Sequence, residues 1–157
     1  TQYQKVASKL ISADSLLYIG RGLDYALSME GSLKLKEISY IHSESYAAGE
    51  LKHGTISLIE DGMPVIAVAT QHDLYEKTMS NIKEVKTRGA TVVMVCGEDM
   101  KFDGNDVDYP VMLPLARDLL MPLVAVVPLQ LIAYYTAALK NFDVDHPRNL
   151  AKSVTVE

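Results

Sequence analysis

The sequence predicts an α/β fold built on a doubly wound, mostly parallel sheet flanked by helices. Two continuous apolar runs, residues 63–70 and 91–96, are rich in β-branched side chains, as is typical of strands covered on both faces. A polar-faced helix is expected between them over residues 73–88, closed by Gly89. Buried strands that alternate with helices of this length indicate such a sheet.

Four elements are predicted before these strands. Residues 1–13 have the pattern of an amphipathic helix, and 15–19 form a short apolar run that ends in a glycine-flanked turn. From residue 23 to about residue 41, leucine and isoleucine recur near the 3.6-residue period of a helix, with Gly31 as the only breaker. A short strand is expected near residues 44–46.

Three segments follow the second apolar run. Residues 108–113 contain a proline and are predicted to form an edge strand. Residues 119–139 form a long apolar helix. The tail, 143–157, is polar, and Pro147 stands where the first turn of a short helix would begin.

The apolar segment 119–139 is long enough to cross a bilayer. Pro122, Pro128 and Gln130 interrupt it, and nothing else in the chain is membrane-like, so we expect no membrane association. A helix that is apolar on every side must be covered on every side, which a small domain rarely achieves alone. We therefore expect an oligomer interface here and a homodimer.

Composition narrows the function further. The 157 residues are 48% hydrophobic and 22% charged, as in a globular domain rather than a disordered chain. The formal charge of −5 argues against nucleic-acid binding. Cys96 is the single cysteine, so no intrachain disulfide or cysteine-rich zinc site can form, and with no secretory signal visible we expect a cytoplasmic protein.

Glu30, Lys34 and Glu37 share one stripe of the predicted helix, at spacings i, i+4 and i+7. One interpretation is a solvated ladder, because Glu four residues before Lys is the favourable order for a surface pair. The other is a carboxylate and an ammonium at the edge of a cleft, where the neighbouring charge tunes a general base. The pattern alone leaves both open.

Two further side chains could carry chemistry. His53 lies in the glycine-bounded turn 49–54, where an imidazole could exchange protons near neutral pH or simply be an exposed loop residue. Lys152 could be a nucleophile if an ordered tail desolvates its amine, or a solvated terminal lysine.

Several ligand classes find no support in the sequence. Residues 20–22 lack the third glycine of a dinucleotide fingerprint, and no P-loop occurs, so a nucleotide cofactor is unsupported. The turn 69–73 has no glycine-rich cradle for a phosphate, so a phosphorylated substrate would need another domain to hold that group. No metal site is expected, because the histidines are scattered at His42, His53, His72 and His146.

Three strings, residues 33–42 (LKLKEISYIH), 46–54 (YAAGELKHG) and 147–157 (PRNLAKSVTVE), closely resemble the glucosamine-6-phosphate synthase family, the isomerizing glutamine:fructose-6-phosphate aminotransferases. The resemblance covers nearly the whole chain, roughly 18–157. It implies the second sugar-isomerase (SIS) domain of the family's C-terminal isomerase half, with fructose-6-phosphate and glucosamine-6-phosphate as substrate and product and with no cofactor.

By this resemblance, Glu37 matches the general base that moves a proton between C1 and C2 as the ketose imine becomes the aldose amine. Lys34 resembles the residue that assists the transfer, and Glu30 is a further active-site neighbour.

The same resemblance gives His53 the role of the ring-opening histidine, which in the family reaches into the active site of the adjacent subunit. Lys152 matches the lysine that forms a Schiff base with open-chain fructose-6-phosphate, and Ala151 beside it contacts the sugar.

The resemblance also implies missing parts. It suggests a helix or linker from a preceding SIS domain at 1–14, the SIS domain at 15–142 and a catalytic tail at 143–157. Nothing in the sequence resembles the family's glutaminase domain or the phosphate-gripping loop of its first SIS domain, and 97–118 carries no assignable motif. We therefore expect catalytic residues but little or no synthase activity from this chain alone.

Two rival functions remain open. A non-catalytic, sugar-phosphate-binding SIS module of a regulator would not need Glu37, His53 and Lys152 together. A pure dimerisation unit would bury the 119–139 helix against a second copy.

Overall fold

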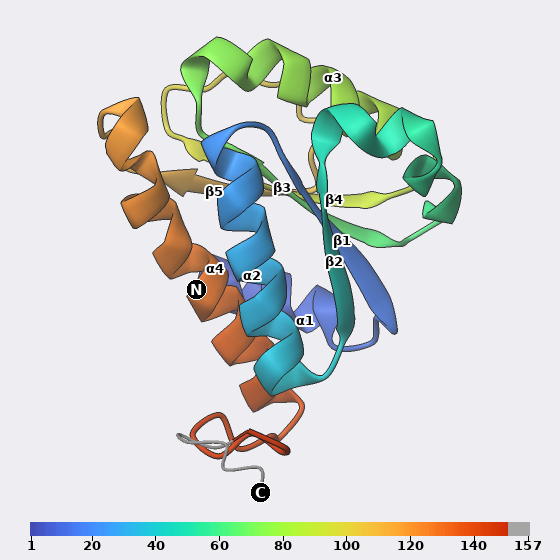
Figure 1. Ribbon diagram of the computed structural model, residues 1–157, viewed down its shortest axis with the longest axis vertical. Coiled ribbons are helices and arrows are strands. Elements are labelled where there is room, and N and C mark those ends of the chain that lie inside the picture. The colour runs from blue at the N-terminus through green and yellow to red at the C-terminus, as the bar shows by residue number, and fades with distance from the viewer. Residues whose placement is uncertain (151–157) are drawn as a thin grey trace, which may run out of the picture.

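The computed structural model describes residues 1–150 and has one five-stranded sheet at its centre (Figure 1). The strand order is β2-β1-β3-β4-β5, and every pairing is parallel. The predicted doubly wound sheet is therefore confirmed, with the proline-containing β5 at an edge. The strands are β1 (Ser15–Gly20), β2 (His42–Ala47), β3 (Pro64–Ala69), β4 (Thr91–Gly97) and β5 (Tyr109–Leu113).

Helices cover both faces of the sheet. On one face, α1 (Gln2–Leu10), α2 (Leu23–Ser39) and α4 (Met121–Leu139) share a core with the sheet; on the other lies α3 (Tyr75–Lys86). These four helices confirm the predicted ones. The connections contain short 3₁₀ turns: η1 (Ala48–His53), η2 (Thr55–Leu58), η3 (His72–Leu74) and η4 (Asp118–Leu120).

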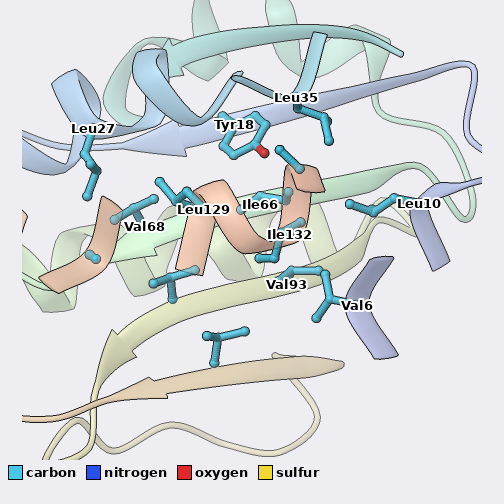
Figure 2. Packing of buried hydrophobic residues seen from close by; sticks show 14 of the residues in the cluster. Val6, Leu10, Tyr18, Leu27, Leu35, Ile66, Val68, Val93, Leu129 and Ile132 are labelled. Atoms are coloured by element: carbon cyan, nitrogen blue, oxygen red, sulfur yellow. The ribbon is translucent and has the colours of Figure 1, made fainter. Parts of the chain in front are cut away.

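The side chains of β3 show why this strand is apolar without interruption. Ile66 and Val68 point into the core beneath α2 and α4, whereas Val65 and Ala67 point into the core beneath α3. Figure 2 shows the first of these cores, where Tyr18 also lies. Since both faces exclude water, each position of the strand favours an apolar side chain.

Helix α2 begins close against the end of β1. A methyl group on Gly20 would lie 2.5 Å from the backbone carbonyl of Asp24, so only glycine permits this approach. Gly31, the predicted breaker, lies inside the unbroken helix. A methyl group there would lie 2.9 Å from the Tyr18 ring, so this glycine makes room for a core aromatic.

Helix α4 has one buried and one exposed face. Ala125, Leu129 and Ile132 are fully buried, whereas Leu123 is 71% exposed. The helix runs through Pro128, so this proline does not interrupt it. In the part of the chain that the structure describes, Asp118–Leu139 is the one helical stretch long and apolar enough to cross a bilayer. One face of this helix packs on α2 and the sheet, and the opposite face is exposed.

The described part of the tail differs from the prediction. Residues 143–150 form turns, so the short helix expected after Pro147 is wrong over these residues. Asp143 explains part of the difference, because its Oδ1 accepts from the backbone N–H groups of Asp145 and His146 at 2.9 and 3.1 Å. Such a local turn competes with helix formation, and Asn149 also has a left-handed φ of 62°.

Candidate functional site

The polar stripe on α2 is present as a chain of ion pairs. Lys34 Nζ lies 2.7 Å from Glu37 Oε2 and 3.9 Å from Glu30 Oε1. The side chains of Lys34 and Glu37 are 34% and 28% exposed, so water reaches both. The hydrogen bond to Glu37 raises the pKa of Lys34, which keeps the amine cationic beside the carboxylates. In this chain alone, the stripe is a half-exposed row of ion pairs in which Lys34 is already paired with Glu37.

The C-terminal tail is fastened to the same end of α2. Tyr40, which ends this helix with a left-handed φ of 60°, accepts a hydrogen bond at its hydroxyl from the Arg148 backbone N–H at 2.9 Å. The Arg148 guanidinium lies 4.0 Å from the centre of the Tyr40 ring, and Phe142 packs against that ring at 4.9 Å. Tyr40 is about one helical turn beyond Glu37, so the structure brings Phe142 and Arg148 to the end of α2 that bears Glu37. Sequence reasoning missed Tyr40 and Arg148.

Ala151 and Lys152 lie outside the described residues. Their predicted roles therefore stay predictions. Lys152 follows Arg148 by four positions in the sequence.

His53 lies at the other end of the sheet from Glu37. It closes η1, which follows the carboxyl end of β2, whereas Glu37 lies near the end of α2, beside the strand's amino end (Figure 1). The six residues of β2 span about 20 Å, so one chain does not bring the two side chains together. The His53 side chain is 76% exposed, with Glu50 as its ion-pair neighbour at 3.7 Å.

The segment that carries His53 contacts α3 and the turn that follows β1. Lys52 Nζ pairs with Glu84 of α3 at 2.8 Å. The Arg21 guanidinium donates twice to Asn81 Oδ1, at 3.1 and 2.9 Å, and it lies directly beneath Gly49. These contacts fix the backbone of η1 and leave the imidazole facing outward.

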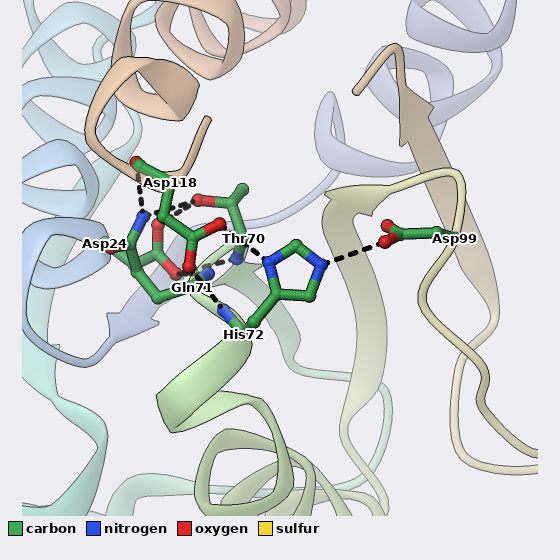
Figure 3. A network of polar contacts seen from close by, with 6 residues as sticks. All are labelled: Asp24, Thr70, Gln71, His72, Asp99 and Asp118. Atoms are coloured by element: carbon green, nitrogen blue, oxygen red, sulfur yellow. Dashed lines mark hydrogen bonds and ion pairs between the residues drawn. The ribbon is translucent and has the colours of Figure 1, made fainter. Parts of the chain in front are cut away.

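A second polar cluster, which sequence reasoning missed, lies at the carboxyl edge of the sheet (Figure 3). His72 Nδ1 lies 2.7 Å from Asp118 Oδ1, and its Nε2 lies 2.8 Å from Asp99 Oδ2. Behind them, the buried Asp24 accepts from Thr70. Burial raises the pKa of Asp24. Nearby, burial raises the pKa of Cys96 to about 12, so this thiol is no candidate nucleophile.

The pair of aspartates should make His72 a titrating group of unusual basicity. Its hydrogen bonds to Asp99 and then Asp118 raise its pKa above 6.5. A raised folded-state pKa gives stability that is fully present below the unfolded value and is lost as pH rises through the folded value. We expect the free energy of unfolding of the wild type to approach that of His72→Gln as pH rises from 6 to 9.

Urea denaturation across this pH range measures the effect. An NMR pKa for His72 at or below 6.5 would contradict the prediction.

Comparisons with known proteins define the class to which this fold belongs. The SIS domain family matches residues 9–140, so the chain belongs to that family. Its relatives are more specific: a glutamine–fructose-6-phosphate aminotransferase (isomerizing) of Clostridium acetobutylicum is 56% identical over 154 residues, 98% of this chain. One from Sphingobium yanoikuyae is 51% identical over 155 residues and is covered over 99% of its length.

A solved structure agrees with these relatives. The C-terminal domain of the glucosamine-fructose-6-phosphate aminotransferase of Francisella tularensis superposes with a TM-score of 0.85 at 38% identity, over 92% of this chain and 41% of that one. The chain spans about a quarter of the length of the Clostridium relative. It therefore corresponds to an SIS region of the isomerase part of such an enzyme.

Proposed function

We propose that this chain supplies the acid–base and amine half of a sugar-phosphate isomerase site. The site would belong to an enzyme that converts fructose-6-phosphate and glutamine into glucosamine-6-phosphate and glutamate in the cytoplasm. The name of the relatives supports this substrate pair, and so does the α2 stripe, to whose residues the resemblance gives catalytic roles.

In the proposed reaction, His53 of a second subunit helps to open the sugar ring by moving a proton. The Lys152 amine then attacks the C2 carbonyl of the open-chain sugar to form a Schiff base, with loss of water. Ammonia released from glutamine in the glutaminase domain then displaces the Lys152 amine and leaves a C2 imine on the sugar. Glu37, in its carboxylate form, next carries a proton between C1 and C2 to give the aldose amine. Lys34 stabilises that form from 2.7 Å away, Glu30 adds a second carboxylate, and Ala151 contacts the sugar.

One observation carries the proposal: the described tail is anchored on Tyr40. That anchor holds Arg148, which precedes Lys152 by four positions in the sequence, at the end of α2 that bears Glu37. The separation of His53 from Glu37 fits a site completed by a second copy of the chain, so we propose a homodimer as the working form. The glutaminase and first SIS domains would be the remaining partners.

Borohydride trapping tests the amine. In an intact enzyme that carries this chain, reduction in the presence of fructose-6-phosphate should leave a covalent adduct on the peptide that contains Lys152, because only an imine is reduced to a stable bond. Lys152→Arg keeps the charge and should give no adduct. An adduct on that variant would disprove the assignment.

Product formation and sugar-phosphate binding provide two further tests. The isolated chain should form no glucosamine-6-phosphate, because the glutaminase step lies in another domain. A protein that binds the sugar phosphate but forms no adduct would instead be a sensing module.

A further inference from the structure

The turn that follows β3 donates a run of hydrogen bonds to carboxylates of the chain itself. The backbone N–H groups of Thr70 and Gln71 donate to Asp24 Oδ2 at 2.7 and 3.2 Å, and the Thr70 hydroxyl donates to Asp24 Oδ1 at 2.6 Å. The next N–H, that of His72, donates to Asp118 Oδ2 at 3.2 Å. Three successive backbone donors and one hydroxyl are thus satisfied by two aspartates (Figure 3).

This turn lies where the strand order of the sheet reverses direction. In the order β2-β1-β3, the chain leaves β1 toward one side for β2 and returns on the other side for β3. In open parallel sheets, the crevice beyond the carboxyl ends at such a reversal is where ligands bind. Consecutive backbone N–H groups make that crevice attractive to anions. In this chain, carboxylates already occupy those donors.

The two aspartates differ in how accessible they are. Asp24 is 1% exposed and belongs to the interior, whereas the Asp118 side chain is 40% exposed. Asp118 uses both carboxylate oxygens on a single residue, because Oδ1 meets the His72 ring at 2.7 Å and Oδ2 meets its backbone N–H. The Gln71 side-chain amide donates to the Asp118 backbone carbonyl at 3.1 Å. Asp118 is therefore the outer carboxylate, and solvent reaches it.

We propose that Asp118 is a built-in counter-anion that closes this turn to oxyanion ligands such as a phosphate monoester. Without its carboxylate, the His72 N–H and imidazole would face solvent as donors. Asp99, which lies on the far side of the ring at 2.8 Å, would still favour the charged imidazolium. In the wild type, these three N–H groups are therefore not free to bind a sugar phosphate.

This inference goes beyond the proposed isomerase function and does not depend on it. The donors and the carboxylate that fills them all belong to this chain, so the test needs neither sugar nor turnover. Failure of the isomerase proposal and failure of this one are therefore separate results.

Inorganic phosphate is the probe. The 157-residue chain is titrated with phosphate against chloride at equal ionic strength, near pH 6 so that the imidazole is charged, and the amide NMR signals are followed. Wild type should show no saturable shift in the turn. Asp118→Ala should show saturable shifts at Gln71 and His72. Its affinity for phosphate should be at least about tenfold higher than any affinity measured for wild type, because charge-assisted hydrogen bonds to phosphate replace those lost with the Asp118 carboxylate.

Asp99→Ala is the matched control, because it removes the other carboxylate of His72 but leaves the turn filled. It should behave as wild type. Asp118→Ser, which is too short to reach both donors, repeats the test should the alanine variant lose its fold. The proposal would be overturned by any of three results: saturable phosphate binding in wild type, binding in Asp99→Ala as tight as in Asp118→Ala, or no binding in a folded Asp118 variant.

Discussion

Glu37→Gln should slow proton transfer between C1 and C2 of the bound sugar by about 10²- to 10⁴-fold in the intact enzyme, the usual contribution of a positioned general base. Glutamine has nearly the same shape and can still accept a hydrogen bond from Lys34, which lies 2.7 Å from the native carboxylate. It cannot take up a proton, so sugar binding should remain largely intact. Incorporation of solvent deuterium into the sugar measures the step directly.

Lys36→Gln provides the control on the same helix. Its side chain is exposed and makes none of the ion pairs of the stripe. It should leave both the exchange rate and the affinity for the sugar near wild-type values. Deuterium exchange at the wild-type rate in Glu37→Gln would remove this carboxylate from the mechanism.

Leu129→Ala should lower the free energy of unfolding by about 2–5 kcal/mol. Leu129 is fully buried in the core of Figure 2, where one of its methyl carbons lies 3.0 Å from the position that a Cβ at Gly31 of α2 would take. Truncation removes apolar contacts and leaves a cavity that two packed helices and a sheet cannot easily close. Urea unfolding followed by circular dichroism gives the difference.

Leu123→Ala makes the same chemical change on the exposed face of α4, where the side chain is 71% accessible. Its effect should stay within about 0.5 kcal/mol. Equal losses in the two variants would mean that α4 does not pack in the orientation described.

The parts of the fold that sequence predicted well are those that periodicity alone defines. The continuous apolar runs of β3 and β4 predicted strands because both faces of the central sheet are covered. The α2 helix was predicted from leucine and isoleucine at helical spacing. The helix is confirmed, but Leu23 and Leu33 are exposed, and its buried face is made largely of small residues such as Ser28. The reason for Gly31 was not predictable, since it depends on the ring of Tyr18 from a neighbouring strand.

The functional residues divide in the same way. Spacing along α2 predicted that Glu30, Lys34 and Glu37 form one stripe, and the ion pairs confirm it. Spacing could not distinguish a solvated ladder from an active site; only the family resemblance did so, and those roles stay predictions.

The cluster at the carboxyl edge was missed because its members come from separate loops. Asp24 and Thr70, for example, are 46 residues apart, and only the strand order brings them together. An acid in the first turn of the helix after β1 was the one available signal.

The close contact between the end of β1 and the start of α2 limits where residues can be inserted into this chain. With Gly20 pressed against the first turn, no slack exists between strand and helix, and Glu37 sits about 21 Å farther along a rigid rod. One residue inserted before Glu37 would turn its carboxylate by about 100° around the helix axis relative to the sheet. Insertions should therefore be tolerated in surface loops such as the one around Gly104, whereas the length of α2 fixes the position of Glu37, the proposed base, relative to the sheet.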